Sequence, residues 1–292
     1  MNQIKIWIEA GRLRTIPASV VPVLVGSSLA YAHNQFHFDV FVVAMLCSML
    51  FQLTSNFTND VYDFRRGADE ERVGPKRLVA SGVISQKAMI TAIFLTASIS
   101  FILGMYLVYL HGFIVLLIGI SSLFFAWMYT GGPYPLAYNG LGDIFVFLFF
   151  GVVAVCGTYF VQTGYYSHYA LLCSISPGLL AANILSANNI RDRIGDAKIR
   201  KNTLAVLLGD ANSRKLYKVV LVVSYLSVFV LFLLTMNPYH LLPFISIPLG
   251  RKLWKSIDTA QGAELTTILV QSAALLMIFG VLQSIGFLIK TT

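Results

Sequence analysis

Nine apolar segments occupy most of this chain, and most of them are long enough to cross a lipid bilayer as a helix. A helix needs about 20 apolar residues to cross the hydrocarbon core, where every backbone polar group must be satisfied internally. We therefore expect an all-α, polytopic membrane protein with about nine transmembrane helices in one bundle. The expected spans are 15–32, 40–59, 88–109, 112–130, 142–162, 168–189, 217–235, 239–254 and 263–288.

The composition agrees with this fold class. The chain is 57% hydrophobic and only 12% charged, whereas soluble domains have about 25% charged residues. No polar linker divides the sequence, so we expect a single membrane domain over residues 1–292. The eighth segment is short and contains Pro243 and Pro248. Before the first span, residues 4–12 alternate apolar and charged side chains, which predicts a short helix at the membrane surface.

Basic residues predict the orientation. With nine spans and a cytoplasmic N-terminus, the only Lys or Arg outside the cytoplasmic loops is Lys290. This asymmetry follows the positive-inside rule and predicts a multi-pass protein of the cell (inner) membrane with cytoplasmic active-site loops. If the eighth segment did not cross, Arg251, Lys252 and Lys255 would lie outside. The same rule accounts for the net charge of +8, so we expect membrane lipid and no nucleic acid as a partner.

Two groups of aspartates stand at the cytoplasmic ends of predicted spans. The first is N59-D-V-Y-D-F-R-R-G-A-D69, and the second is N188-N-I-R-D-R-I-G-D196. Residues four apart share a helix face, so Asn59 lies beside Asp63 and Asp192 beside Asp196. Asp69 follows Gly67, where a break in the helix would return it toward the first pair; Asp60 completes this group.

Two carboxylate pairs on facing helices predict a magnesium diphosphate site. Magnesium prefers oxygen ligands and is often held by one or two carboxylates together with substrate phosphates. Basic side chains would contact the remaining phosphate oxygens, and the candidates are Arg72, Lys76, Arg77, Lys198, Arg200 and Lys201. We favour Arg77 and Lys201, which closely follow the two motifs. The alternative is that these charges are solvated loop ends in ion pairs, but two similar motifs on one membrane face argue against it.

Aromatic residues are abundant, with 21 Phe and 14 Tyr, and an apolar helical bundle can hold a long lipid tail. Aromatic faces also stabilise cations. Tyr129, in the segment Y-T-G-G-P, stands at the cytoplasmic end of the fourth span. Its hydroxyl would either reach a phosphate oxygen or anchor the helix at the interface, and the residues alone leave both readings open.

These motifs resemble those of the UbiA superfamily of membrane prenyltransferases. More narrowly, NDVYDFRRGAD with RVGPKRLVASGVIS, and NNIRDRIGDAKIRKNTLAVLLG, resemble the dihydroxynaphthoate polyprenyltransferases of the MenA type. The opening RLRTIPASVVPVLVG and the middle YTGG…GLGDIFVFLFFG also fit, so the resemblance covers most of the chain. Two departures are Val61, where many members have an aromatic residue, and residues 197–200, where a glycine often precedes the lysine matched by Lys201.

The resemblance implies roles for particular residues, with Mg²⁺ as the cofactor. The implied metal ligands are Asn59, Asp63, Asp69, Asp192 and Asp196. The implied substrate contacts are Arg72, Arg77, Tyr129, Asn189 and Lys201, and catalytic roles fall to Asp63, Asp192 and Lys201. The implied reaction joins a polyprenyl group from a polyprenyl diphosphate to 1,4-dihydroxy-2-naphthoate, with decarboxylation to demethylmenaquinone.

Three alternatives remain open from the sequence. The fold could serve another acceptor, namely 4-hydroxybenzoate, homogentisate or a glycerol phosphate. A cation-coupled transporter is a different class, but transporters place ionisable groups near the bilayer midplane, whereas these cluster at one membrane edge. A non-catalytic membrane scaffold is disfavoured because both aspartate motifs are complete.

Overall fold

A computed structural model describes residues 3–68, 74 and 77–289. The predicted site residues Asp69 and Arg72, and the basic residues Lys76 and Lys290, lie outside these ranges. Across the described residues the regular elements are helices, apart from one isolated parallel bridge between Asn139 and Asn202. The all-α prediction is therefore confirmed.

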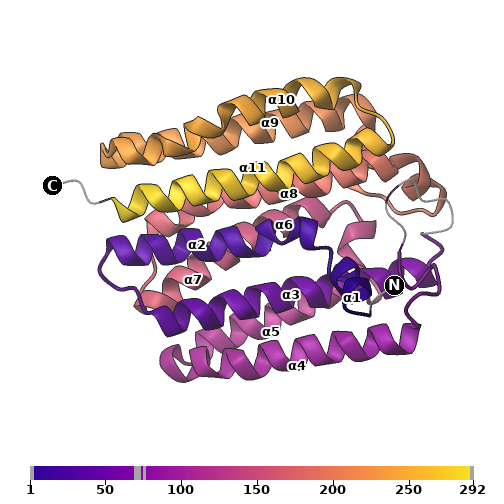
Figure 1. The fold of residues 1–292 in the computed structure, drawn as a ribbon, viewed down its shortest axis with the longest axis horizontal. Coiled ribbons are helices and arrows are strands. Elements are labelled where there is room, and N and C mark those ends of the chain that lie inside the picture. The colour runs from indigo at the N-terminus through magenta and orange to yellow at the C-terminus, as the bar shows by residue number, and fades with distance from the viewer. Residues whose placement is uncertain (1–2, 69–73, 75–76, 290–292) are drawn as a thin grey trace.

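The helices run side by side along the long axis of the molecule (Figure 1). In chain order they are α1 (Gln3–Ala10), η1 (Leu13–Thr15), α2 (Pro17–Ala32), α3 (Phe38–Arg65), α4 (Gln86–His111), α5 (Phe113–Met128), η2 (Leu136–Tyr138), α6 (Gly142–Phe147), the π-helix η3 (Leu148–Val153), α7 (Ala154–Thr163), α8 (His168–Lys198), α9 (Leu204–Thr235), η4 (Pro238–Ser246), α10 (Ile247–Thr259) and α11 (Ala263–Leu288).

Each predicted span falls on one of these elements or on a continuous run of them. In the described part of the chain, six helices are long and apolar enough to cross a membrane: α3, α4, α6 to α7, α8, α9 and α11. A seventh candidate is the pair of α1–η1 and α2, which is bent by 57°. The fourth predicted span is the shorter apolar helix α5, and the eighth is η4 with α10. The protein is a multi-pass membrane protein.

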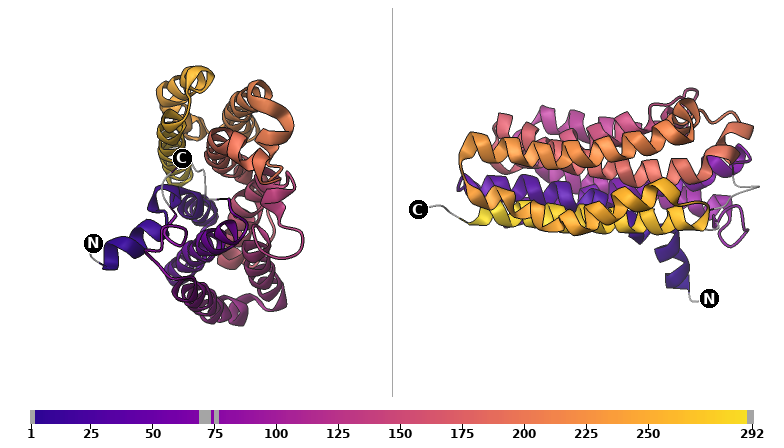
Figure 2. Two further views of the ribbon diagram at one scale, coloured as in Figure 1. Left: turned by 90° about the vertical axis from the view of Figure 1, so that its right-hand side faces the viewer. Right: turned by 90° about the horizontal axis from the view of Figure 1, so that it is seen from above.

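The short N-terminal helix α1 projects from the side of the bundle (Figure 2, right). The prediction of a helix at residues 4–12 is therefore close to the observed bounds. Its buried residues Ile6 and Ala10 face the bundle, and Trp7 packs edge-on against Phe57 of α3 with ring centroids 5.9 Å apart. This packing holds the N-terminal segment against the half of α3 that carries the first aspartate motif.

The two aspartate helices end at the same end of the bundle and in the same way (Figure 1). In α3 the amide of Ala68 donates to the carbonyl of Asp63 over 3.0 Å, with Gly67 at φ 72°. In α8 the amide of Lys201 donates to the carbonyl of Asp196 over 2.8 Å, with Arg200 at φ 57°. Both ends are Schellman motifs, in which a left-handed residue closes the helix. Each motif therefore places an aspartate in the last turn of its helix.

The π-helix η3 and the helix α8 make a close backbone contact. A Cβ atom on Gly151 would lie only 2.7 Å from the Cα of Gly178, so glycine is needed for η3 to approach α8. The π-helix widens the turn at this point; such turns are frequent at functional sites. Phe145 of α6 and Phe149 of the π-helix have stacked rings with centroids 6.2 Å apart.

Candidate active site

Asp63 is the centre of the polar cluster at the end of the bundle where α3 and α8 end. Its side chain is only 2% exposed, and its Oδ2 accepts a hydrogen bond from Arg77 Nη2 over 2.8 Å. Its Oδ1 accepts another from the hydroxyl of Tyr138, also over 2.8 Å. Burying a carboxylate is costly unless it is paired and hydrogen-bonded, and these two donors provide that compensation.

Lys201 joins the two aspartate motifs. Its Nζ lies 3.5 Å from Asp196 Oδ1 and 3.9 Å from Asp63 Oδ1. The ring of Tyr138 lies beneath two cations, with Lys201 Nζ 5.3 Å and Arg66 Cζ 4.6 Å from its centroid. The position of both motifs at one end of the predicted spans indicated that they would face each other, and the structure brings them together through this lysine.

The second motif carries its own buried ion pair. Arg191 donates from Nε and Nη2 to the two oxygens of Asp192, each over 2.8 Å, and from Nη2 to Asn188 Oδ1 over 2.7 Å. Its Nη1 reaches Thr266 of α11 over 3.0 Å. A Cβ on Gly74 would lie 2.5 Å from Arg191 Nη2, so the loop after the first motif touches the second one.

The amide side chains of both motifs contact neighbouring elements. Asn59 Oδ1 accepts a hydrogen bond from Thr130 Oγ1 over 2.7 Å. The adjacent backbone is held by Arg66, which donates to the carbonyl oxygens of Thr130 and Gly132 over 2.6 and 3.1 Å. Asn189 Nδ2 lies 3.5 Å from Asp143 Oδ2 at the start of α6. The loop between α5 and α6 is therefore part of the site.

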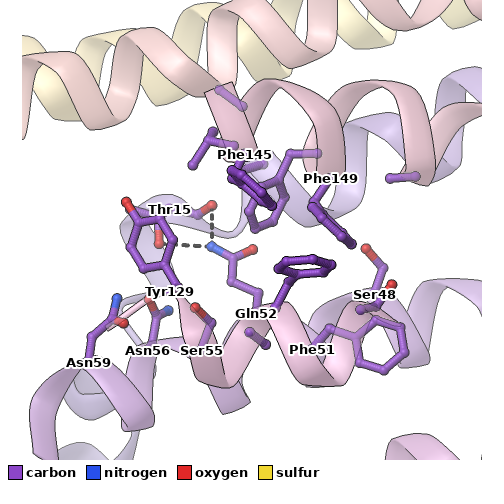
Figure 3. Close-up of a pocket in the computed structure, with 18 of the residues that line it drawn as sticks. Thr15, Ser48, Phe51, Gln52, Ser55, Asn56, Asn59, Tyr129, Phe145 and Phe149 are labelled. Atoms are coloured by element: carbon purple, nitrogen blue, oxygen red, sulfur yellow. Dashed lines mark hydrogen bonds between the residues drawn. The ribbon is translucent and has the colours of Figure 1, made fainter. Parts of the chain in front are cut away.

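A cavity of about 760 Å³ opens from this polar cluster into the apolar interior. Its volume lies within the range of ligand pockets, about 300–1,000 Å³. The predicted site residues that line it are Asn59, Asp63, Arg77, Tyr129, Asn189 and Lys201. Two predicted site residues that the structure describes, Asp192 and Asp196, do not line the cavity. Arg191 lines it instead, next to Asp192 in the sequence. Figure 3 shows the polar residues of α3 opposite Phe145 and Phe149.

The oxygen atoms of the site suit a magnesium ion that is bound together with a substrate. Asp60 Oδ1 and Asp196 Oδ2 are buried and make no hydrogen bond, although buried polar atoms normally have a partner. Within the described ranges, no three His, Cys, Asp or Glu side chains form a ready-made metal site. Magnesium is commonly held by one or two carboxylates and completed by phosphate oxygens and water. The residues fit an ion that arrives with a diphosphate.

Sequence reasoning missed several residues of this site. Tyr138 and Thr130 bond to Asp63 and Asn59 from a loop more than 65 residues away in the chain, and no local spacing links them. The sequence shows Arg191 next to Asp192, but it does not show the two hydrogen bonds that Arg191 donates to this carboxylate. The guanidinium group is also held by Thr266 of α11, which is distant in the sequence. The only available signal was the position of the 129–143 segment at the cytoplasmic end of two predicted spans.

Comparison with known proteins extends over nearly the whole chain. The sequence profile of the UbiA prenyltransferase family matches residues 19–283. A relative from Haemophilus influenzae, named 1,4-dihydroxy-2-naphthoate octaprenyltransferase, is 36% identical and is covered over 97% of its length and 99% of this chain. A relative of the same name from Mycobacterium leprae is 31% identical, over 93% of its length and 94% of this chain.

A solved structure has the same fold. A UbiA homolog from Archaeoglobus fulgidus bound to GPP and Mg²⁺ superposes with a TM-score of 0.67 at 15% identity, over 96% of this chain and 99% of that one. At this identity the likeness establishes the arrangement of helices.

Proposed function

Since the chain belongs to the UbiA prenyltransferase family, we propose that it transfers a polyprenyl group from a polyprenyl diphosphate to 1,4-dihydroxy-2-naphthoate. The ring carboxylate is lost in the process, which gives demethylmenaquinone. The observation that carries the proposal is the cavity with Asp63, Arg77 and Lys201 at its polar end and aromatic side chains in its interior. The choice of acceptor is supported by the names of the relatives.

The polar end of the cavity suits a magnesium-bound diphosphate. Asn59, Asp63, Asp69, Asp192 and Asp196 would hold the ion, together with the uncompensated oxygen of Asp60. Magnesium would neutralise phosphate charge and so help the diphosphate to leave.

The cations of the site would change partners when the donor substrate binds. Arg77 and Lys201 now neutralise Asp63, and both lie on the cavity wall, within reach of an incoming anion. Arg191 covers both oxygens of Asp192, so it has to give them up before this carboxylate can bind the ion. Arg72, Tyr129 and Asn189 complete the proposed substrate contacts.

The interior of the cavity would hold the prenyl chain and exclude water. Phe125, Phe145 and Phe149 form an aromatic wall, with centroid distances of 5.0, 5.2 and 6.2 Å between their rings. The faces of such rings stabilise a developing allylic cation. With the site at the cytoplasmic edge of the cell (inner) membrane, the prenyl tail reaches the cavity from the lipid and the polar acceptor from the cytoplasm.

The test is a transfer assay on membranes containing the protein. It would use 1,4-dihydroxy-2-naphthoate and a radiolabelled polyprenyl diphosphate, with and without magnesium, and with the Asp63→Asn variant as the inactive reference. We expect a magnesium-dependent prenylated naphthoquinone from the wild type only. Transfer to 4-hydroxybenzoate, homogentisate or glycerol phosphate instead of naphthoate would keep the diphosphate site and reject this acceptor. If the folded protein transferred the prenyl group to none of these acceptors, the proposed enzymatic function would be wrong. A cation-coupled transporter would then be the alternative to test.

A further inference from the structure

The helix α10 has one buried face and one basic face. The buried residues are Gly250, Leu253 and Ile257, which pack α10 against the bundle. Arg251, Lys252 and Lys255 are exposed. At 3.6 residues per turn, these three basic residues lie on the side of the helix opposite the buried ones. The outer surface of α10 is therefore positively charged.

The helix α9 runs beside α10 and adds to this charged surface (Figure 1). Lys218 of α9 joins the two helices, because its ammonium group forms an ion pair with Asp258 and lies 5.1 Å from the centroid of the Trp254 ring. Lys215, about one helical turn earlier, is exposed. The outer faces of α9 and α10 thus form one surface.

Most of the positive charge on this surface is uncompensated. The residues Lys215, Lys218, Arg251, Lys252 and Lys255 are called the basic cluster below. Within the part of the chain that the structure describes, Lys218 is the only one of the five with an ion-pair partner, Asp258. Clustered charges of one sign attract ligands of the other sign. The basic cluster is therefore suited to bind an anion.

The basic cluster lies where both helices leave the apolar part of the bundle. The stretch 219–235 of α9 contains no Asp, Glu, Lys or Arg and rises about 25 Å. The returning stretch 238–250, which is a 3₁₀-helix followed by the start of α10, contains none either and rises about 24 Å. The hydrocarbon core of a bilayer is about 30 Å thick. Both stretches therefore end close to the level of the lipid headgroups.

The neighbouring side chains agree with this level. Trp254 is 40% exposed, and tryptophan is enriched where lipid headgroups meet the hydrocarbon. Directly after Lys218, the outer face of α9 exposes Val219, Val222 and Leu226. Cations at headgroup level next to an exposed apolar surface match the two parts of a phospholipid, namely its phosphate and its acyl chains.

We propose that the basic cluster binds an anionic phospholipid from the leaflet at the end of the bundle that carries the aspartate motifs. Lys215, Arg251 and Lys255 contact the phosphate, and the acyl chains lie along the exposed apolar face of α9. No residue of the basic cluster lines the cavity, so the lipid site is separate from the site of the reaction. The proposal is independent of the acceptor.

Trp254 provides a local reporter for the test, because bromine atoms on nearby acyl chains quench tryptophan fluorescence. The variant Trp7→Phe with Trp127→Phe leaves Trp254 as the only tryptophan. This protein is reconstituted into phosphatidylcholine vesicles with rising fractions of brominated phosphatidylglycerol or brominated phosphatidylcholine. We expect half-maximal quenching at a roughly 5- to 25-fold lower fraction of phosphatidylglycerol, which corresponds to one or two basic residues near an anionic headgroup.

Two double variants separate the site from the general charge of the protein. Arg251→Gln with Lys255→Gln should bring the two lipids within about twofold of each other. Arg65→Gln with Lys87→Gln removes the same charge from exposed positions on α3 and α4, and should keep the full preference. Equal quenching by both lipids with the basic cluster intact, or an equal loss in the two double variants, would overturn the proposal.

Native mass spectrometry repeats the comparison on the full-length protein with all its tryptophans. The protein in detergent is mixed with phosphatidylglycerol or phosphatidylcholine, and the bound lipid is counted. Phosphatidylglycerol should remain bound to the wild type, and its occupancy should fall by about fivefold or more in Arg251→Gln with Lys255→Gln. Equal occupancy in this variant would reject the site. Displacement by glycerol phosphate, which has a phosphate but no acyl chain, would show that the cluster binds a soluble anion and would reject the lipid.

Discussion

The hydroxyl of Tyr138 donates a hydrogen bond to Asp63 Oδ1 over 2.8 Å, and so ties the loop between α5 and α6 to the first aspartate motif. The same ring lies against Arg66 and Lys201. The backbone extends the link, because the carbonyl of Tyr138 accepts a hydrogen bond from the amide of Asn202 over 3.0 Å. Tyr138 therefore touches both motifs, and we infer that it orients Asp63.

Replacing Tyr138 by Phe should lower kcat by roughly 10-fold while leaving the cation–ring contacts in place. A hydrogen bond to a charged group contributes about 1.5–3 kcal/mol, and only part of this acts on turnover. Burial raises the pKa of Tyr138 above its ordinary value, and the charge of Asp63 raises it further. The hydroxyl thus stays protonated through neutral pH, so the loss should be the same from about pH 6 to pH 9.

A matched control is Tyr134→Phe in the same loop, because that side chain is 55% exposed. It should keep full activity. A loss in Tyr138→Phe that grows with pH, or an equal loss in the control, would contradict the positioning role.

Removing the carboxylate of Asp63 should affect stability and activity separately. Asp63→Ala withdraws the partner of buried Arg77, and breaking a buried pair costs about 3–5 kcal/mol. We expect a lower unfolding temperature together with loss of transfer. The double variant Asp63→Ala with Arg77→Met should regain much of the unfolding temperature and stay inactive. If it regained activity as well, Asp63 would be structural only.

The sequence predicted the helical fold and the aspartates for a clear physical reason. The length of an apolar segment and a spacing of four residues are local properties of the sequence. The spans, and the position of Asn59 and Asp63 on one helix face, could therefore be predicted directly. Tyr138 and Arg191 could not, because their roles depend on contacts with distant elements. Arg200 is instructive, because it adopts the left-handed conformation at φ 57° although it is not a glycine. The Schellman turn at this point therefore forms without a glycine.

Replacing Lys201 should weaken the binding of polyprenyl diphosphate much more than replacing Lys198, although both lysines follow the second motif. Lys201 has a side chain that is 11% exposed and bridges Asp63 and Asp196, whereas Lys198 is exposed. Lys201→Met should raise the KM for polyprenyl diphosphate by at least about 10-fold, since a phosphate contact and the bridge between the motifs are both lost. Lys198→Met should leave it within about twofold. Steady-state kinetics with saturating acceptor would decide, and similar effects of the two variants would place the phosphate contact elsewhere.

Magnesium should bind this protein tightly only together with a diphosphate. The carboxylates of Asp63, Asp192 and Asp196 are paired with Arg77, Arg191 and Lys201, respectively. Within the described residues, no three metal-binding side chains form a cluster. A ligand that binds only the folded state raises the unfolding temperature, and the rise grows with the ratio of its concentration to its Kd. In thermal unfolding in detergent, magnesium alone should therefore change the unfolding temperature of the wild type little, and magnesium with inorganic pyrophosphate should raise it by several degrees.

The Asp196→Asn variant should lose most of the rise that magnesium and pyrophosphate cause together, because it alters the buried carboxylate that has an oxygen without a hydrogen-bond partner. A full shift with magnesium alone would instead mean that the protein holds the ion before its substrate arrives.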